Sequence, residues 1–499
     1  MSTVDPDLAL DRAALDRARL SRDARFDGRF YIAVLSTRIY CRPICPAPSP
    51  KPDNVRYYPT AAAAAEAGFR PCLRCRPEAA PASPAWLGVS AVVRRALRLI
   101  DEGALDDGTV AELADRLGIG ARHLRRLFDR HVGASPLAVA LTRRLHFAKR
   151  LVDETDLSMT EIALASGYGS IRRFNAAFRS NYGRPPSDLR RRRRVSARSG
   201  SGILLRLACR PPYDRRGMLD FLARHAIDGI EEVADEAYSR SIVLGKRPAR
   251  LTVRLPADGR AIECEIDGAP PGTLFNAVNR VRRMFDLAVD PEQVAATLAR
   301  DECLAPLVER YAGQRIPGSW DEFECAVRCL LGKGCPTRER ELCARLVAAC
   351  GADTGAPGAE ALRYLFPDPR RLARARLEEL GLGKSEAGAL RALALATEAG
   401  ELDFAAAPAD VLARLGAVPG IAPPVVEEIA LRALGEPDAF PIGEPELRQL
   451  ARLAPGRRLG SGASLAAEDW RPWRGYAALL LRRASAEAAA ARAASAVAV

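Results

Sequence analysis

The chain has 499 residues, several times the roughly 100–200 residues of one domain, so about three to five folded units are expected. Its 48% hydrophobic and 27% charged residues match globular proteins and exclude a disordered, collagen-like or coiled-coil chain. No segment approaches the roughly 18 apolar residues of a membrane span, and the N-terminus lacks the apolar core of a signal peptide. A cytoplasmic protein that does not contact a membrane is therefore expected.

The positive charge is concentrated at the N-terminal end. Residues 1–200 hold 35 basic and 21 acidic residues, a net +14, whereas residues 201–499 hold 40 and 41, a net −1. Such an asymmetry indicates a partner with a dense negative surface, most often nucleic acid. A coding bias toward arginine stays open as an alternative, because only 5 of the 75 basic residues are lysine.

Two segments of linker composition mark the predicted domain boundaries. Residues 76–85 (RPEAAPASPA) are rich in Pro and Ala, and residues 190–202 (RRRRRVSARSGSG) are typical of a charged hinge. The predicted fold class is multidomain and mostly α. Its units are a small α+β domain, a tandem helix-turn-helix domain, a second small α+β domain, an all-α domain and an Ala-rich tail, over residues 1–80, 86–194, 203–288, 291–483 and 484–499.

Four of the twelve cysteines have the spacing of a zinc site. Cys41 and Cys45 form a Cys-x3-Cys pair, and 26 residues separate them from the Cys-x2-Cys pair Cys72 and Cys75. We expect them to bind one Zn²⁺, with iron or a redox pair as the alternatives. Four zinc-bound thiolates carry a formal charge of −2, so each sulfur stays nucleophilic while the cluster repels DNA. A purely structural zinc stays open at this point.

Residues 30–75 (FYIAVLSTRIYCRPICPAPSPKPDNVRYYPTAAAAAEAGFRPCLRC) resemble the N-terminal zinc domain of the Ada family of bacterial DNA-methylation sensors. The resemblance implies that Cys41, the first cysteine of Cys-Arg-Pro-x-Cys, accepts a methyl group from a DNA phosphotriester, as a methyltransferase that acts once. Methylation turns a thiolate into a thioether and removes one negative charge, which allows closer approach to phosphate. Arg38 departs from the family, which usually has Gly there.

The segment from residue 86 to residue 194 contains two units with a helix-turn-helix pattern. In the first, residues 109–133, apolar residues recur on one helix face and Gly118 makes the turn. In the second, Phe174 and Phe178 form an i, i+4 apolar stripe. A tandem pair favours DNA binding over a solvated basic face. The side chains expected to face DNA are Arg122, Arg125, Arg126, Ser170, Arg172, Arg173 and Asn175.

The same stretch resembles the AraC-type DNA-binding domain, including its closing FNAAFRSNYGRPPSDLR. The resemblance implies sequence-specific binding to double-stranded DNA and transcription activation, with RNA polymerase as a partner and association with the nucleoid. Arg172 and Arg173 suit bidentate contacts with guanine, and Asn175 suits adenine. The arginines at 190–194 suit phosphates or form only a solvated linker.

Residues 203–288 are expected to form strands around one helix, because ILLRLACRPPY, ARLTVRL and AIECEI have strand character. From about Pro291 the pattern is amphipathic helix almost without interruption. Around residue 420, a helix, a tight Pro-Gly-Ile turn and a second helix predict a hairpin whose turn amides could hold a phosphate. The Ala-rich tail has no apolar face, and we assign it no function.

Residues 203–483 resemble the AlkA-type 3-methyladenine DNA glycosylases through LRLACRPPYDRRGMLDFLARHAIDGIEEV, the hairpin near Gly420 and WRPWRGYAALLL. That family has a small mixed domain ahead of a helix-hairpin-helix domain. It flips an alkylated base out of the duplex and hydrolyses its bond to deoxyribose with the help of a carboxylate. The position of that carboxylate falls on Glu444, and Gly420 and Lys333 become candidate contacts to DNA phosphate.

Three departures from that family bear on base removal. Glu444 replaces an Asp and is one methylene longer. Residues 420–424 (Gly-Ile-Ala-Pro-Pro) lose the second turn glycine, two N–H donors and the aromatic expected to stack on the base. Gly334 stands where a wedge side chain fills the gap left by the flipped base. The chain also has no Pro-Cys-His-Arg segment, so methyl transfer from guanine oxygen is expected to be absent.

The expected function is therefore a response to DNA alkylation damage. It combines methyl transfer to Cys41, activation of repair genes, and removal of alkylated bases such as 3-methyladenine. The alternative is a transcription regulator with a structural zinc and a glycosylase-like module that binds DNA without hydrolysis.

Overall fold

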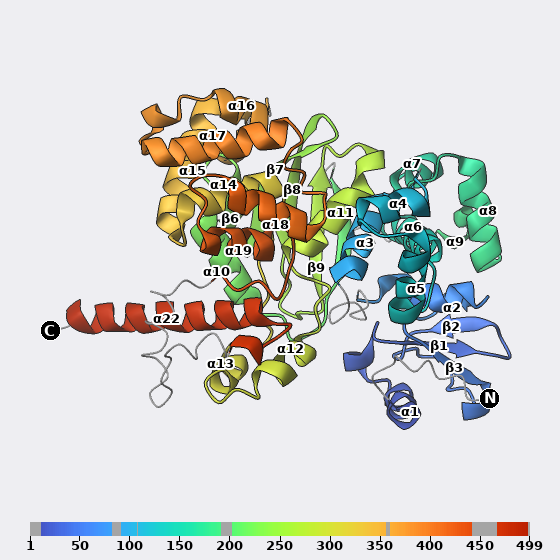
Figure 1. The fold of residues 1–499 in the computed structure, drawn as a ribbon. Helices are drawn as coiled ribbons and strands as arrows, with labels where there is room; N and C mark the ends of the chain where they lie inside the picture. The colour runs from blue at the N-terminus through green and yellow to red at the C-terminus, as the bar shows by residue number, and fades with distance from the viewer. Residues whose placement is uncertain are drawn as a thin grey trace.

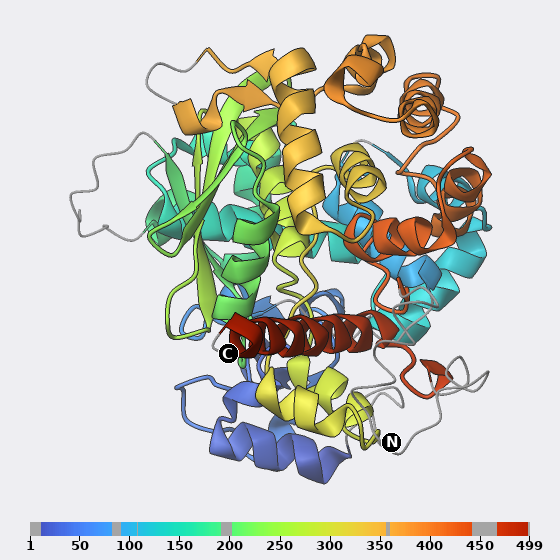
Figure 2. The same cartoon turned by 90° about the vertical axis from the view of Figure 1, so that its left-hand side faces the viewer.

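The structure is a computed structural model that describes residues 11–81, 91–106, 108–190, 202–355, 360–441 and 467–497. An N-terminal lobe (residues 11–190) and a C-terminal lobe (residues 202–497) lie side by side (Figures 1 and 2). Helices α3 (Ala91–Asp101) and α11 (Leu274–Met284) touch at the junction between them. The multidomain, mostly α fold class is confirmed. Within the described ranges, no helix is long and apolar enough to cross a membrane.

The first unit is a small sheet covered by a helix on each face. The strands follow the order β3-β1-β2-β4, with β4 parallel to β2 and the other pairs antiparallel. Ile32 packs with Leu15 of α1, whereas its neighbour Tyr31 packs with Ala64 of α2, as the alternation of a strand requires. The elements are α1 (Arg12–Ser21), β1 (Tyr31–Val34), β2 (Ile39–Cys41), β3 (Val55–Tyr58), α2 (Ala61–Glu66) and β4 (Arg70–Pro71).

The second unit contains the predicted pair of helix-turn-helix motifs. Each motif opens on a capping box, made by Thr109 with Glu112 and by Ser158 with Glu161. The long helix α6 joins the two motifs and was not singled out by the sequence pattern. After α3, the helices are α4 (Val110–Arg116), α5 (Ala121–Val132), α6 (Pro136–Glu154), α7 (Met159–Ala165), α8 (Ile171–Tyr182) and α9 (Pro186–Leu189).

The third unit is an antiparallel sheet in the order β5-β9-β8-β7-β6 with helices α10 and α11. The three strands expected from the sequence are present, but the sheet has two more, β6 and β7, and a second helix. The elements before α11 are β5 (Ile203–Ala208), α10 (Arg215–His225), β6 (Glu231–Ala234), β7 (Ala237–Leu244), β8 (Arg247–Arg254) and β9 (Ala261–Asp267).

In its described residues, the fourth unit is helical apart from one short strand pair, and α18 and α19 form the predicted hairpin. Helix α22 continues through residues 484–497, so the predicted start of the tail falls inside a helix. The elements are α12 (Pro291–Leu298), α13 (Ala305–Arg310), α14 (Glu322–Gly332), α15 (Pro336–Cys350), β10 (Ala352–Asp353), β11 (Tyr364–Leu365), α16 (Pro369–Arg374), α17 (Lys384–Glu398), α18 (Pro408–Ala417), α19 (Pro423–Arg432) and α22 (Arg474–Val497).

The two lobes share a hydrophobic core. One continuous cluster of buried side chains runs from the second helix-turn-helix motif into the five-stranded sheet and α11. Phe147 of α6 and Phe275 of α11 meet in it edge to face, with ring centroids 5.0 Å apart. The helix-turn-helix unit is therefore packed onto the C-terminal lobe as part of one folded body.

Candidate functional site

The four predicted zinc ligands come together in the first unit. Cys41 is the last residue of β2, Cys45 follows in the next loop, and Cys72 and Cys75 come directly after β4. Because β4 runs parallel to β2, the Cys72 amide donates to the Tyr40 carbonyl at 3.0 Å and both pairs reach the same end of the sheet. Their sulfur atoms all lie within 4.8 Å of one another.

The donor set of this cluster fits zinc. As free thiols the cysteines share protons. Hydrogen bonds with Cys45 and Cys72 raise the pKa of Cys41. The hydrogen bond with Cys41 in turn lowers the pKa of Cys45 to about 7. A metal ion replaces such shared protons, and four close sulfur donors are the set that structural Zn²⁺ prefers. Cys72 and Cys75 are buried, whereas Cys41 and Cys45 are partly open to solvent.

Arg42, which directly follows Cys41 in the Cys-Arg-Pro sequence, stabilises the cluster through hydrogen bonds to Cys75. Its amide donates to the Cys75 sulfur at 3.4 Å, and its guanidinium donates to the Cys75 carbonyl at 3.0 Å. The same guanidinium forms a two-point ion pair with Asp27. Sequence analysis did not single out Arg42, although its place inside the motif was a usable signal.

The zinc unit is tied to the DNA-binding helices by contacts that begin beside its ligands. The Tyr40 hydroxyl lies 2.9 Å from His146 Nε2 on α6. Arg76, which directly follows Cys75, forms an ion pair of 2.8 Å with Asp153 near the end of α6. Both contacts connect a residue adjacent to a ligand with the helix that joins the two helix-turn-helix motifs.

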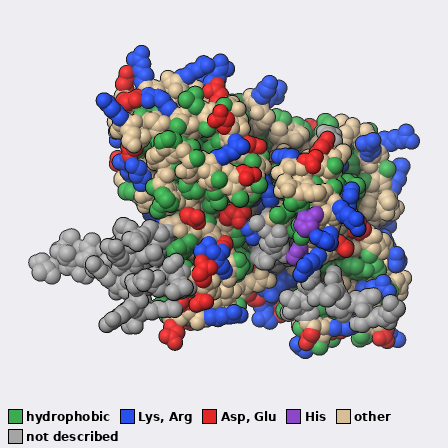
Figure 3. All heavy atoms as spheres, viewed as in Figure 1, with side chains coloured by type: hydrophobic (Ala, Val, Ile, Leu, Met, Phe, Trp, Pro, Cys, Tyr) green, Lys and Arg blue, Asp and Glu red, His purple; other side chains and the backbone are tan. Residues whose placement is uncertain are grey.

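The second helix of each motif presents the predicted cationic side chains to solvent. Arg122, Arg125 and Arg126 on α5, and Arg172 and Arg173 on α8, are all exposed. Their DNA contacts stay predictions. Lys and Arg side chains stand out on the right of the space-filling view, over the part of the N-terminal lobe that carries these helices (Figure 3).

The other two predicted contacts in this domain lie closer to the protein. Asn175 is half-buried, and the Ser170 hydroxyl accepts from the Arg173 amide at 3.2 Å as the N-cap of α8. Ser170 therefore caps the start of α8, and this capping bond occupies one hydrogen-bonding position of its hydroxyl.

Lys333 and Gly420, far apart in the sequence, meet the same element. Lys333 follows α14 and forms an ion pair of 2.6 Å with Glu386 in the first turn of α17. Gly420 has φ +92° in the hairpin turn, and a Cβ there would lie 2.9 Å from Ala389 of α17. Only glycine fits this close approach. The two turns predicted to contact DNA thus lie together at the start of α17.

The hairpin has a reduced set of amide donors. Pro423 and Pro424 occupy the first two positions of α19, where free N–H groups would otherwise point toward a ligand. The chain then leaves α19 toward Glu444, which lies outside the described residues, as does the 191–194 arginine run. On the way, the Phe440 amide donates to Glu427 at 2.8 Å, and Arg482 donates to the Pro441 carbonyl.

Models of three families match separate parts of the chain. The "Metal binding domain of Ada" matches residues 14–78, a "Helix-turn-helix domain" matches residues 113–192, and the "AlkA N-terminal domain" matches residues 204–321.

Relatives among known proteins cover the same parts. The "Probable bifunctional transcriptional activator/DNA repair enzyme AlkA" of Mycobacterium tuberculosis is 40% identical over 472 residues, or 92% of this chain and 94% of that protein. The "DNA-3-methyladenine glycosylase 2" of Escherichia coli is 31% identical over 276 residues, or 54% of this chain and 93% of that protein. The "Bifunctional transcriptional activator/DNA repair enzyme Ada" of the same species is 40% identical over 119 residues, or 24% and 32%.

Proposed function

Because the chain belongs to the family of bifunctional transcriptional activator/DNA repair enzymes of the AlkA type, we propose that its Cys41 takes a methyl group from a DNA phosphotriester and that the methylated protein activates repair genes. The C-terminal lobe removes alkylated bases such as 3-methyladenine. The observation that carries the proposal is the cluster of four sulfur atoms, which includes Cys41 and is joined to a tandem helix-turn-helix domain.

Methyl transfer to Cys41 is a single displacement. The Cys41 sulfur attacks the methyl carbon, the S–C bond forms as the C–O bond to phosphate breaks, and the phosphate leaves as a diester anion. Zinc, when bound, keeps the sulfur deprotonated at neutral pH. The resemblance to the Ada family selects Cys41 as the acceptor among the four cysteines. The thioether product is stable, so each chain reacts once.

Loss of one negative charge at Cys41 strengthens DNA binding. Before transfer the cluster repels the phosphate backbone, and after transfer this repulsion is smaller. The contacts of Tyr40 and Arg76 with α6 join the cluster to the DNA-binding helices, so both bind the same duplex. As an activator bound at a promoter, the protein works with RNA polymerase and associates with the nucleoid.

Base removal is assigned to the C-terminal lobe with Glu444 as the carboxylate that stabilises the cationic sugar. The turns at Lys333 and Gly420 support this assignment because they lie together at the start of α17. Two turns that bind the same DNA strand need to be close to each other in this way. The proline pair at the start of α19 favours the second candidate, a lobe that binds damaged DNA without hydrolysis, because it removes phosphate-binding amides.

Mass spectrometry tests the acceptor. The zinc-loaded chain is incubated with a duplex that carries methylated phosphotriesters, digested, and mapped for added methyl groups. We expect one methyl group on Cys41 in the native protein and in Cys335→Ala, which removes an exposed cysteine outside the cluster. We expect none in Cys41→Ala. A folded, zinc-loaded native protein without methyl on Cys41, or one methylated at Cys335 instead, contradicts the proposal.

A further inference from the structure

Helices α14 and α19 pack against each other in the C-terminal lobe. Arg98 contacts Glu322 at the start of α14 and Leu434 just after the end of α19, so the two helices run in opposite directions. One end of this pair carries the turn at Lys333 and the hairpin turn at Gly420. The other end, formed by the start of α14 and the last turn of α19, faces α3 of the N-terminal lobe. Because helices are stiff, a contact that fixes one end of the pair also fixes the spacing of the turns at the other end.

Arg98 of α3 bridges both helices at that far end. Its guanidinium forms an ion pair with Glu322 in the first turn of α14. It also donates to the carbonyls of Ala433 at 3.3 Å and Leu434 at 3.1 Å, just beyond the last turn of α19. Its Nε donates to Glu102 of its own helix at 3.0 Å. All its donor nitrogens are thus engaged, and three of these contacts cross between the lobes.

Burial makes the Arg98 bridge strong. The Arg98 side chain is 11% exposed and Glu322 is 19% exposed, so water screens the pair little. Burial lowers the pKa of Arg98, but Glu322 and Glu102 outweigh it and hold the pKa above its usual value. The guanidinium therefore stays charged, and a cation suits the negative end of the α19 dipole.

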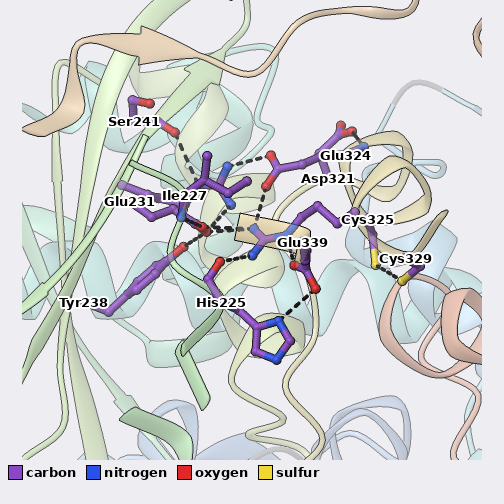
Figure 4. Close-up of polar contacts among 12 residues, drawn as sticks. His225, Ile227, Glu231, Tyr238, Ser241, Asp321, Glu324, Cys325, Cys329 and Glu339 are labelled. Carbon is purple, nitrogen blue, oxygen red and sulfur yellow. Dashed lines mark hydrogen bonds and ion pairs between the residues drawn. The ribbon is translucent and has the colours of Figure 1, made fainter. Parts of the chain in front are cut away.

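The start of α14 is already fixed to the five-stranded sheet, which makes it a firm base for this bridge. Two residues after Glu322, Glu324 forms an ion pair of 2.6 Å with Arg240 of β7. Arg328 of α14 pairs with Glu231 at 3.0 Å and with Glu339 at 2.8 Å (Figure 4). All five side chains are buried. Arg98 extends this anchored network from α14 to α19.

We propose that Arg98, a residue of the DNA-binding unit, is a positioning residue for the repair lobe. It locks the start of α14 to the end of α19 and thereby sets the spacing between the turns at Lys333 and Gly420. The inference rests on the proposed function only in that these two turns contact damaged DNA. The N-terminal lobe then supports the geometry of the DNA-contacting turns in the C-terminal lobe, in addition to binding DNA itself.

The chemistry of the bridge requires arginine at position 98. Only the planar fork of a guanidinium offers separate donors to Glu322 and to the two carbonyls of α19 at once. A lysine reaches one side of the bridge and leaves the other unpaired. The neighbouring Arg94 pairs with Glu436, beyond the end of α19.

The test compares full-length native protein with Arg98→Ala and Arg98→Lys. The control is Arg370→Ala, which removes an exposed arginine that forms only a 3.9 Å pair with Glu398. Hydrogen exchange is followed in α14, α19, α5 and α8. In parallel, each protein is titrated with a duplex that contains a tetrahydrofuran abasic analogue.

We expect Arg98→Ala to speed exchange in α14 and α19, to leave α5 and α8 unchanged, and to weaken abasic-duplex binding by about 2- to 30-fold. Arg98→Lys recovers part of both effects, and Arg370→Ala behaves as native. Unchanged exchange in α14 and α19, or an equal rise in α5 and α8, overturns the inference. If native protein does not bind the abasic duplex, the assigned role of the two turns fails, while the exchange data still decide whether Arg98 locks the helices.

Discussion

Arg38 shows how one residue can depart from a family's usual glycine and keep the fold. Its φ is +55°, in the left-handed region that favours glycine. Such a backbone costs other residues roughly 1–2 kcal/mol. The Arg38 guanidinium lies 4.6 Å from the centre of the Phe69 ring, and a cation–π contact returns about 0.5–1 kcal/mol. The turn before β2, and with it the position of Cys41, is therefore retained at a small net cost.

Asp286 is a buried carboxyl whose ionisation opposes folding at mildly acidic pH. Burial raises its pKa to about 6, although its carboxylate accepts from the Tyr476 hydroxyl at 2.6 Å and the Ile316 amide at 3.1 Å. The unfolded chain loses this proton near pH 3.8. Between about pH 4 and pH 6 the Asp286 carboxyl holds its proton more in the folded state than in the unfolded state, so its contribution to stability falls as pH rises, by roughly 2–3 kcal/mol in total. The buried His146, whose pKa is lowered by burial to about 4, acts in the opposite direction over the same range.

The change Asp286→Asn tests this sign. The amide oxygen can accept the same two hydrogen bonds without ionising, and asparagine tolerates the φ of +48° at this position. We expect the unfolding free energy of the variant, relative to that of the native protein, to rise between pH 4 and pH 6, as measured by denaturant titration of both proteins at several pH values. A pH profile parallel to that of the native protein would contradict the assignment.

Residues of the site differ in how far the sequence predicts them. The four cysteines are predictable because metal ligands need fixed residue types at short spacings. Arg98 is not, because its partners Glu322 and Leu434 lie more than 200 residues away in the chain. Before folding, Arg98 is one of many arginines on an amphipathic helix.

At the level of elements, α5 and α8 are the helices that we propose distinguish one DNA sequence from another. Both are 12-residue helices with their apolar face packed inward and their arginines outward. Helices of this kind enter the major groove and read base edges. They owe their orientation to the motif's first helices, whose capping boxes fix where α4 and α7 begin.

Substitution of Arg172 or Arg173 by Ala should weaken specific binding by about 1–3 kcal/mol, roughly 5- to 150-fold, and relax the preference at the base each one contacts. Binding is measured on a sequence selected from random duplexes with native protein, at fixed salt. Arg370→Ala on α16, an exposed arginine of the other lobe, should bind as native. Equal losses in all three variants would show a general charge effect and contradict the role given to α8.

Elements were predicted well where pattern and burial agree. The hairpin of α18 and α19 and both helix-turn-helix motifs have apolar residues at helical spacing between clear turns. Strand β7 (Ala237–Leu244) was missed because its sequence, AYSRSIVL, places Arg240 at a buried position. That arginine is accepted only because Glu324 and Glu231, on other elements, neutralise it.

At the scale of the whole molecule, the two lobes behave as one folded body. Two helices join the DNA-binding unit to the C-terminal lobe: α6 through the common core and α3 through the Arg98 bridge. A linker composition near residue 195 predicts separate domains from sequence. It does not reveal that Phe147 packs across the junction, because interdomain packing depends on surfaces that local patterns do not encode.

Truncation of Phe147 should therefore destabilise both lobes together. Its side chain is 5% exposed, and such a change costs about 3–5 kcal/mol. Calorimetry of Phe147→Ala should show one transition at a lower temperature than native. Leu141→Ala, on the same helix at an exposed position, should unfold as native. Two separate transitions, with only that of the N-terminal lobe displaced, would contradict a shared core.

The most direct test of the central claim follows both repair reactions on one sample of methylated DNA. Native protein is added to duplex DNA that carries methyl phosphotriesters and 3-methyladenine, and protein-bound methyl and released base are measured over time. We predict that methyl on Cys41 stops at one per chain, while free base keeps rising past one per chain. Cys41→Ala should lose only the first signal and Glu444→Gln only the second. Native protein that gains no methyl on Cys41, or that releases no base above the buffer rate while folded and bound to DNA, would contradict the account.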